Sequence, residues 1–151
     1  MTHAEKARDL FLSGCSCSQA VLGAYCEELG VPMETALRIA SSFGGGIGGS
    51  RELCGAVSGM LMAAGLKWGY TDVHDLDVKK AYYARTRTLL DAFKAEHGTT
   101  CCRELLASLS EIKTEPSART AQYYKERPCA RYVETAARLI EEMDERTDAA
   151  S

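Results

Sequence analysis

A chain of 151 residues, 46% of them hydrophobic, is long enough to bury a core of its own, and we expect one domain. The formal net charge of −3 argues against nucleic acid as a partner. The main apolar stretch, residues 53–66, is too short to cross a hydrocarbon layer of about 30 Å, so we do not expect membrane insertion.

The seven cysteines are the most informative feature of the composition. The first residues lack the apolar core of a signal peptide, so we predict a cytoplasmic protein. The cytosol keeps thiols reduced, and cysteines there more often bind metals, act in redox chemistry or lie in the core than form a disulfide framework. No Cys-x-x-Cys pair is present, which counts against a zinc ribbon or a thioredoxin-type motif.

Apolar residues recur at helical spacing along the chain, and no long stretch alternates with the period of two typical of strands. The sequence therefore predicts an all-α fold, a single-domain bundle of six to eight helices over residues 1–147, with a frayed tail at 148–151. Capping and stop signals place the helices at about residues 2–14, 17–30, 32–43, 53–69, 71–97, 101–109, 118–126 and 128–147.

Two helix starts carry a capping box, Thr2 with Glu5 and Ser16 with Gln19. For the long helix, we expect the N-cap at Thr71 or Asp72. Its buried side is expected to carry Leu76, Tyr83, Leu90 and Phe93.

A glycine run, residues 44–49, precedes the central apolar helix. Because glycine tolerates positive φ angles, we expect a tight, exposed turn there. Within the helix, Gly55, Gly59 and Ala63 recur at four-residue steps and form one smooth groove. Since glycine in a helix costs about 1 kcal/mol relative to alanine, the groove predicts close approach of another helix or of a buried cofactor.

Cysteines fall at the starts of four separate helices: Cys17, Cys54, the adjacent Cys101 and Cys102, and Cys129. If these helix starts converge, their free N–H groups and positive dipole ends make an electropositive pocket lined by low-pKa thiols. Such a pocket suits an iron–sulfur cluster or another thiolate-bound metal, or a reactive dithiol pair.

Five segments, in this order, carry a family resemblance: Gly14-Cys15-Ser16-Cys17-Ser18-Gln19-Ala20-Val21, Phe43-Gly44-Gly45-Gly46-Ile47-Gly48, Cys54-Gly55-Ala56-Val57-Ser58-Gly59, Cys102-Arg103-Glu104-Leu105-Leu106 and Pro128-Cys129. With them the chain resembles the redox-active protein family C_GCAxxG_C_C over residues 17–133. The resemblance implies redox activity or cluster binding. The family's four cysteines correspond to Cys17, Cys54, Cys102 and Cys129, and the additional cysteines are Cys15, Cys26 and Cys101.

Three hypotheses follow. In the first, the four thiolates hold an iron–sulfur cluster or another soft metal, and the protein transfers electrons to a redox partner protein. In the second, the thiols cycle with a disulfide and no cofactor, with Cys54 as the best nucleophile. In the third, the chain is a helical interaction module whose glycine groove binds a partner helix or forms a homodimer, and its cysteines are structural. Whether the protein is an oxidoreductase or an electron carrier stays open.

Other signals have simpler interpretations. The glycine run matches G-x-G-x-x-G, but a dinucleotide site needs a preceding strand. We instead expect backbone around the cysteine site at Gly45, Gly46, Gly48 and Gly55. Cys26 is expected to be a buried, inert thiol, and His97 to be explained by its place at a helix end. The basic and aromatic residues around Arg119, Tyr123 and Arg127 are expected to form a solvated face.

Overall fold

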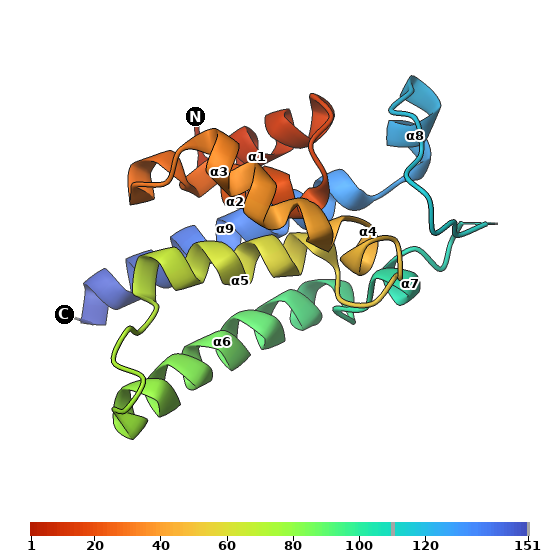
Figure 1. The fold of residues 1–151 in the computed structure, drawn as a ribbon. Coiled ribbons are helices and arrows are strands. Elements are labelled where there is room, and N and C mark those ends of the chain that lie inside the picture. The colour runs from red at the N-terminus through yellow and green to blue at the C-terminus, as the bar shows by residue number, and fades with distance from the viewer. Residues whose placement is uncertain (110, 151) are drawn as a thin grey trace.

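The computed structural model describes residues 1–109 and 111–150, with side chains up to residue 146, and it confirms the all-α fold (Figure 1). Its elements are α1 (His3–Leu12), α2 (Cys17–Tyr25), η1 (Glu27–Leu29), α3 (Met33–Ala40), η2 (Ser41–Phe43), α4 (Gly44–Ile47), α5 (Gly55–Trp68), α6 (Leu76–His97), α7 (Cys102–Leu105), α8 (Ala121–Glu126) and α9 (Cys129–Ala150). Gly45 and Gly46 have left-handed angles, so α4 is a glycine turn. Counted without it, the described residues contain eight α-helices and no strand, within the expected number.

Side-chain caps fix two of the predicted helix starts. Thr2 accepts the N–H of Glu5 and caps α1. Ser16 and Gln19 form the complete capping box of α2. The long helix α6 begins later than predicted, because Asp75 accepts the N–H of Val78 and is the N-cap. Asp72, the predicted cap, instead accepts the N–H of His74 in the preceding turn.

The helix α2 forms the centre of the bundle and packs against α1, α5 and α9 (Figure 1). Its residues 20–25 are all buried, as expected for a helix that is apolar on every side. The groove predicted on α5 faces α2: a Cβ at Gly59 would lie 2.7 Å from the carbonyl oxygen of Ser18. This part of the groove is filled by a helix of the same chain and offers no surface to a dimer partner.

The long helix α6 lies along the outside, against α5 and α9 (Figure 1). Its fully buried side chains are Leu89 and Phe93, both in its second half. Leu76 and Tyr83 are 60% and 52% exposed, so the prediction that they face the core is wrong. The first half of α6 runs along the surface. Apolar residues at helical spacing are therefore exposed there, although the same spacing usually indicates a buried face.

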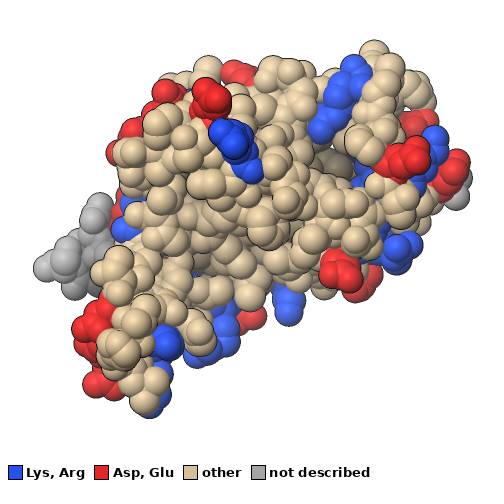
Figure 2. Space-filling model, viewed as in Figure 1, with Lys and Arg blue, Asp and Glu red and all other residues tan. Residues whose placement is uncertain are grey.

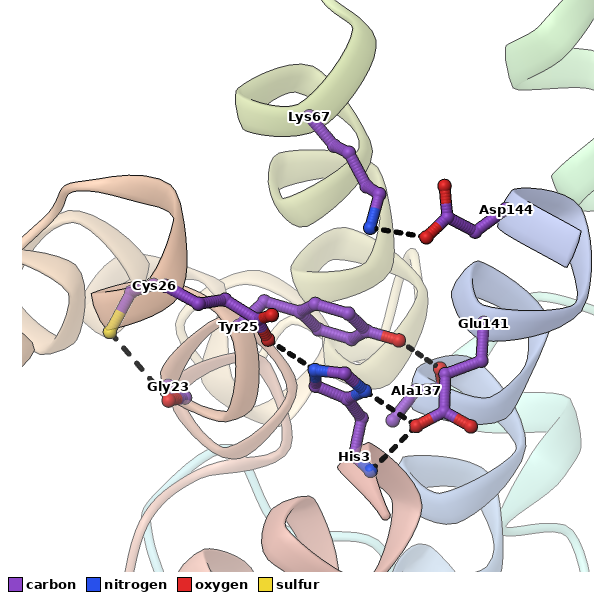
Figure 3. A network of polar contacts seen from close by, with 9 residues as sticks. His3, Gly23, Tyr25, Cys26, Lys67, Ala137, Glu141 and Asp144 are labelled. Carbon is purple, nitrogen blue, oxygen red and sulfur yellow. Dashed lines mark hydrogen bonds and ion pairs between the residues drawn. The ribbon is translucent and has the colours of Figure 1, made fainter. Parts of the chain in front are cut away.

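A polar cluster at the start of α1 joins three helices (Figure 3). The ring of His3 stacks on the buried Tyr25 of α2, with the centroids 4.0 Å apart. The His3 backbone N–H donates to Glu141 of α9 at 2.7 Å, and the imidazole contacts Glu141 and Glu28. The Tyr25 hydroxyl donates to the carbonyl of Ala137 on α9 at 2.7 Å. These contacts hold α1, α2 and α9 in register.

The end of the chain leaves one prediction open. Helix α9 runs to Ala150, and Ser151 lies outside the described residues, so a domain ending at 147 with a frayed tail stays a prediction. Within the described residues, no helix has both the length and the apolar content that a membrane span requires.

Candidate functional site

One end of the bundle contains a cavity of about 320 Å³. It lies where the glycine turn α4, the short helix α7 and the first residues of α2, α5 and α9 meet (Figure 1). The space-filling view shows a hollow at this end, with basic side chains beside it (Figure 2). Four cysteines from four helix starts line the cavity: Cys17, Cys54, Cys102 and Cys129.

Each of these cysteines is positioned by the helix at whose start it lies. Cys17, Cys102 and Cys129 are the first residues of α2, α7 and α9. Cys54 is the N-cap of α5, one residue before the first turn in which it was expected. Because the four helices point their N-terminal ends at one cavity, thiols far apart in the sequence become neighbours.

The glycine turn brings backbone close to these thiols. Gly45, Gly46 and Gly48 have φ angles of 65°, 68° and 58°, the left-handed region that favours glycine. A Cβ at Gly46 would lie 2.7 Å from the Cβ of Cys102, and a Cβ at Gly55 would lie 3.2 Å from the Cβ of Cys17. All four glycines expected around the site line the cavity. That they bind a cofactor stays a prediction.

Backbone hydrogen bonds join the loop before α5 to the loop before α7. The N–H of Cys54 donates to the carbonyl of Thr100 at 2.8 Å, and the N–H of Cys102 donates to the carbonyl of Glu52 at 2.6 Å. An isolated antiparallel bridge pairs Leu53 with Cys101 between these two bonds. The two cysteine-bearing loops therefore form one paired unit.

Cys17 and Cys129 both line the cavity, and their thiols interact. The interaction with Cys17 lowers the pKa of Cys129 to about 7 against the opposing effect of burial. The same interaction, followed by burial, raises the pKa of Cys17 well above its usual value. At neutral pH, Cys17 is thus protonated and Cys129 is partly ionised.

Cys54 was expected to be the best nucleophile. It is 4% exposed, and burial raises its pKa to about 12 although the N–H groups of Val57 and Ala56 favour the thiolate. Burial thus opposes the thiolate that the helix N-terminus was expected to favour, and the role of Cys54 as the best nucleophile stays a prediction. Burial also raises the pKa of Cys102, against the effect of a hydrogen bond from Arg51.

Arg51 is a buried cation that the sequence did not single out. It is 6% exposed, and its backbone has a φ of 59°, which is uncommon outside glycine. Its Nε and Nη2 donate to the carbonyl of Lys113 at 2.9 and 2.7 Å, and its Nη1 lies 3.7 Å from the Cys102 sulfur. A guanidinium is thereby fixed against one wall of the cavity.

Two further arginines, Arg119 and Arg127, line the cavity with Tyr123, so the prediction of a solvated face is wrong. The Arg119 guanidinium lies 4.7 Å from the Phe11 ring centroid and 4.8 Å from that of Tyr123. It donates to the carbonyl of Cys15 at 3.1 Å. Arg127 lies 5.0 Å from the Tyr123 centroid. The four-residue spacing of Arg119, Tyr123 and Arg127 was the available sequence signal.

The other cysteines and His97 lie away from the cavity lining. Cys26 is fully buried, with its thiol directed to the carbonyl of Gly23, as expected for a core thiol. Cys15 and Cys101 are partly exposed. The ring of His97 is hydrogen-bonded to Thr135 at 2.9 Å.

The arrangement gives a single bound metal ion no support. Within residues 1–109 and 111–146, no three His, Cys, Asp or Glu side chains are placed to hold one metal ion. The four thiols nevertheless line one cavity, and the iron–sulfur cluster expected there stays a prediction.

Comparison with known proteins agrees with the four-cysteine pattern. Residues 15–143 match the model of the family described as "Putative redox-active protein (C_GCAxxG_C_C)". No curated protein and no solved structure matches the chain. Since the match covers most of the chain, including all four cavity cysteines, this protein is a member of the C_GCAxxG_C_C redox-active family.

Proposed function

We propose that this protein performs thiol–disulfide exchange, with Cys129 as the attacking thiolate and Cys17 as the resolving thiol. The observation that carries the proposal is that Cys17 and Cys129 line the same cavity, where the interaction with Cys17 lowers the pKa of Cys129. The redox character of the family supports it.

The opposite protonation of the two thiols suits this division of roles. A thiolate is the nucleophile in disulfide exchange, and the best attacking thiol has a pKa near the ambient pH. Cys129, with a pKa of about 7, meets this condition. Cys17 keeps its proton until Cys129 is consumed. Once Cys129 is part of a mixed disulfide, its negative charge is gone, and Cys17 loses its proton more readily and attacks the Cys129 sulfur.

Cys54 and Cys102 have a supporting role in this proposal. Both are buried, and both interact electrostatically with Cys129. As protonated thiols they make the wall of the cavity without adding negative charge beside the Cys129 thiolate. No three described side chains are placed to hold a single metal ion, which the exchange proposal does not need.

Timed alkylation of the reduced protein at pH 7, with peptide mass spectrometry, tests the assignment. We expect Cys129 to be modified first among the cavity thiols and Cys26 to be among the slowest of all seven cysteines. Mild oxidation of a separate sample that has not been alkylated should link Cys17 to Cys129, with a loss of two hydrogens in mass. Preferential labelling of Cys54, or a first disulfide that excludes Cys129, would contradict the assignment.

Anaerobic purification followed by metal analysis and an absorption spectrum tests the alternative. A stoichiometric metal that protects all four cavity cysteines from alkylation, and releases them together on removal, would replace the exchange proposal. We expect no such joint protection.

The variant Cys17→Ala is expected to shift the pH profile of Cys129 alkylation upward. If its pKa returned from about 7 to the ordinary 9.0, the thiolate fraction at pH 7 would fall roughly 50-fold. The higher pKa would make the remaining thiolate roughly tenfold more nucleophilic, so the net rate should fall about fivefold. Cys101→Ala, which removes a thiol outside the cavity lining, is the matched control. An unchanged profile in Cys17→Ala would show that Cys17 does not set the ionisation of Cys129.

A further inference from the structure

The cavity has a positive charge balance within an acidic chain. Its ionisable lining, apart from the cysteines and tyrosines, consists of Arg51, Arg119, Arg127 and one carboxylate, Glu115. The whole chain has a formal net charge of −3. In the part of the chain that the structure describes, none of the three arginines forms an ion pair. Three guanidiniums outnumber the one carboxylate around this hollow, and the positive balance attracts an anion.

The protein's own contacts hold two of these cations in place without neutralising them. Arg119 is held by the carbonyls of Phe11 and Cys15 and by the neighbouring rings, and its other guanidinium N–H groups have no acceptor among the described residues. Arg127 rests on Tyr123, and no hydrogen bond from its guanidinium is found among the described residues. A guanidinium with free N–H groups binds a carboxylate in a fixed geometry.

We propose that the substrate of this cavity is a small disulfide that carries carboxylate groups, with Arg119 and Arg127 binding a carboxylate while the S–S bond meets Cys129. This inference rests on the proposed thiol–disulfide function and names the class of its oxidant. The cavity volume of about 320 Å³ lies at the lower end of the range for small-molecule sites. It is larger than a single inorganic oxyanion needs, which favours an organic anion.

The exchange balances without a further reactant. The Cys129 thiolate attacks one sulfur of the disulfide RSSR, its S–S bond breaks, and one RS⁻ leaves while a Cys129–S–SR bond forms. Cys17 loses its proton and attacks the Cys129 sulfur, and the second RS⁻ leaves. Two electrons pass from the two cysteines to RSSR, which becomes two RSH by taking up the proton of Cys17 and one proton from the solvent, into which Cys129 released its own. The guanidiniums also stabilise the negative charge near the leaving thiolate.

A charge series of disulfides tests the proposal on the reduced, full-length protein. The probes are 3,3′-dithiodipropionate, which is dianionic, 2-hydroxyethyl disulfide, which is neutral, and cystamine, which is dicationic. For each probe, the rate of Cys17–Cys129 disulfide formation at pH 7 is divided by its rate with dithiothreitol, which removes differences in leaving-group chemistry. We expect the normalised rate of the anionic probe to exceed that of the neutral probe about tenfold and cystamine to be slowest. The preference should shrink at high salt.

Two arginine variants test which side chain causes the preference for the anionic disulfide. Arg127→Gln should lose most of the anionic-to-neutral ratio, while Arg131→Gln, an exposed arginine outside the cavity lining, should keep it. Because a change in the ionisation of Cys129 alters the rates of all probes alike, the ratio reports recognition of charge rather than reactivity. Thermal unfolding of each variant verifies that it is folded.

The outcomes separate this inference from the function on which it rests. Formation of the Cys17–Cys129 disulfide at equal normalised rates with all three probes, or fastest with cystamine, overturns the anionic substrate and leaves the exchange function standing. Failure of every probe to form this disulfide overturns both. An anionic preference that survives in Arg127→Gln overturns the assignment of that arginine.

Discussion

Replacing Gly59 by leucine is expected to lower the free energy of unfolding by about 3 kcal/mol or more. A Cβ at this position would already lie 2.7 Å from the carbonyl oxygen of Ser18 and 2.9 Å from the Cβ of Val21. Both atoms belong to the central helix α2, which is packed on its other sides and cannot move away. Leucine adds three further carbons that find no space. Urea denaturation monitored by circular dichroism measures the loss.

The same helix provides the matched control. Gly65 also lies in α5, but its nearest neighbour would be the Tyr82 hydroxyl at 3.5 Å, an ordinary contact. Gly65→Ala should therefore keep or raise the stability, because alanine favours a helix by about 1 kcal/mol over glycine. Equal stabilities of Gly59→Leu and the wild type would show that α2 and α5 are not in such close contact.

The reduced protein is expected to lose stability steeply above pH 9. Burial raises the pKa of Cys54 to about 12 in the folded state, whereas the unfolded thiol titrates near 9.0. A pKa that is higher in the folded state contributes stability that is complete below pH 9 and is lost as the pH rises toward 12. The loss is about 1.4 kcal/mol per pH unit for this one group. The raised pKa values of Cys17 and Tyr25 act in the same direction.

The shifted pKa of Cys129 changes the stability with pH in the opposite direction. Its folded pKa of about 7 lies below 9.0, so its contribution is present above pH 9 and is lost as the pH falls through 7. Midpoints of urea denaturation, measured at pH 7, 9 and 10.5 in the presence of a reductant, separate the pH range in which Cys129 contributes from that of Cys54. Cys54→Ala should show a shallower loss above pH 9 than the wild type. A flat alkaline profile in the wild type would mean that the buried thiols ionise without cost.

Local sequence signals were sufficient for the fold and for the positions of the cavity cysteines. The capping box at Ser16 and Gln19 fixes the start of α2, and Pro128 precedes the first residue of α9. These signals act within one turn of the helix, so they do not depend on the rest of the structure. The start of α6 was missed because two nearby aspartates can act as caps, and Asp75 caps the helix while Asp72 caps the preceding turn.

The reactivity of a thiol could not be predicted from its position at a helix start. The helix N-terminus and burial act on its pKa in opposite directions, and the effect of burial is larger. A helix N-terminus favours a charge by about 0.3–1 kcal/mol. The rise of the Cys54 pKa from 9.0 to about 12 corresponds to roughly 4 kcal/mol against the thiolate, so burial dominates. The low pKa of Cys129 depends on Cys17, more than a hundred positions away in the chain. The positive charge in the cavity lining depends on the tertiary positions of Arg51 and Arg119. No local pattern contains that information.

The pairing between the loops before α5 and α7 has a consequence for local opening of the protein. Cys54 and Cys102 each donate a backbone hydrogen bond to the other's loop. A fluctuation that frees one loop must break the bonds that hold the second, so the two loops open as a single cooperative unit. In any one molecule, these two sulfurs therefore become accessible to solvent together or not at all, and damage by an oxidant that reaches one of them during such an opening will also reach the other.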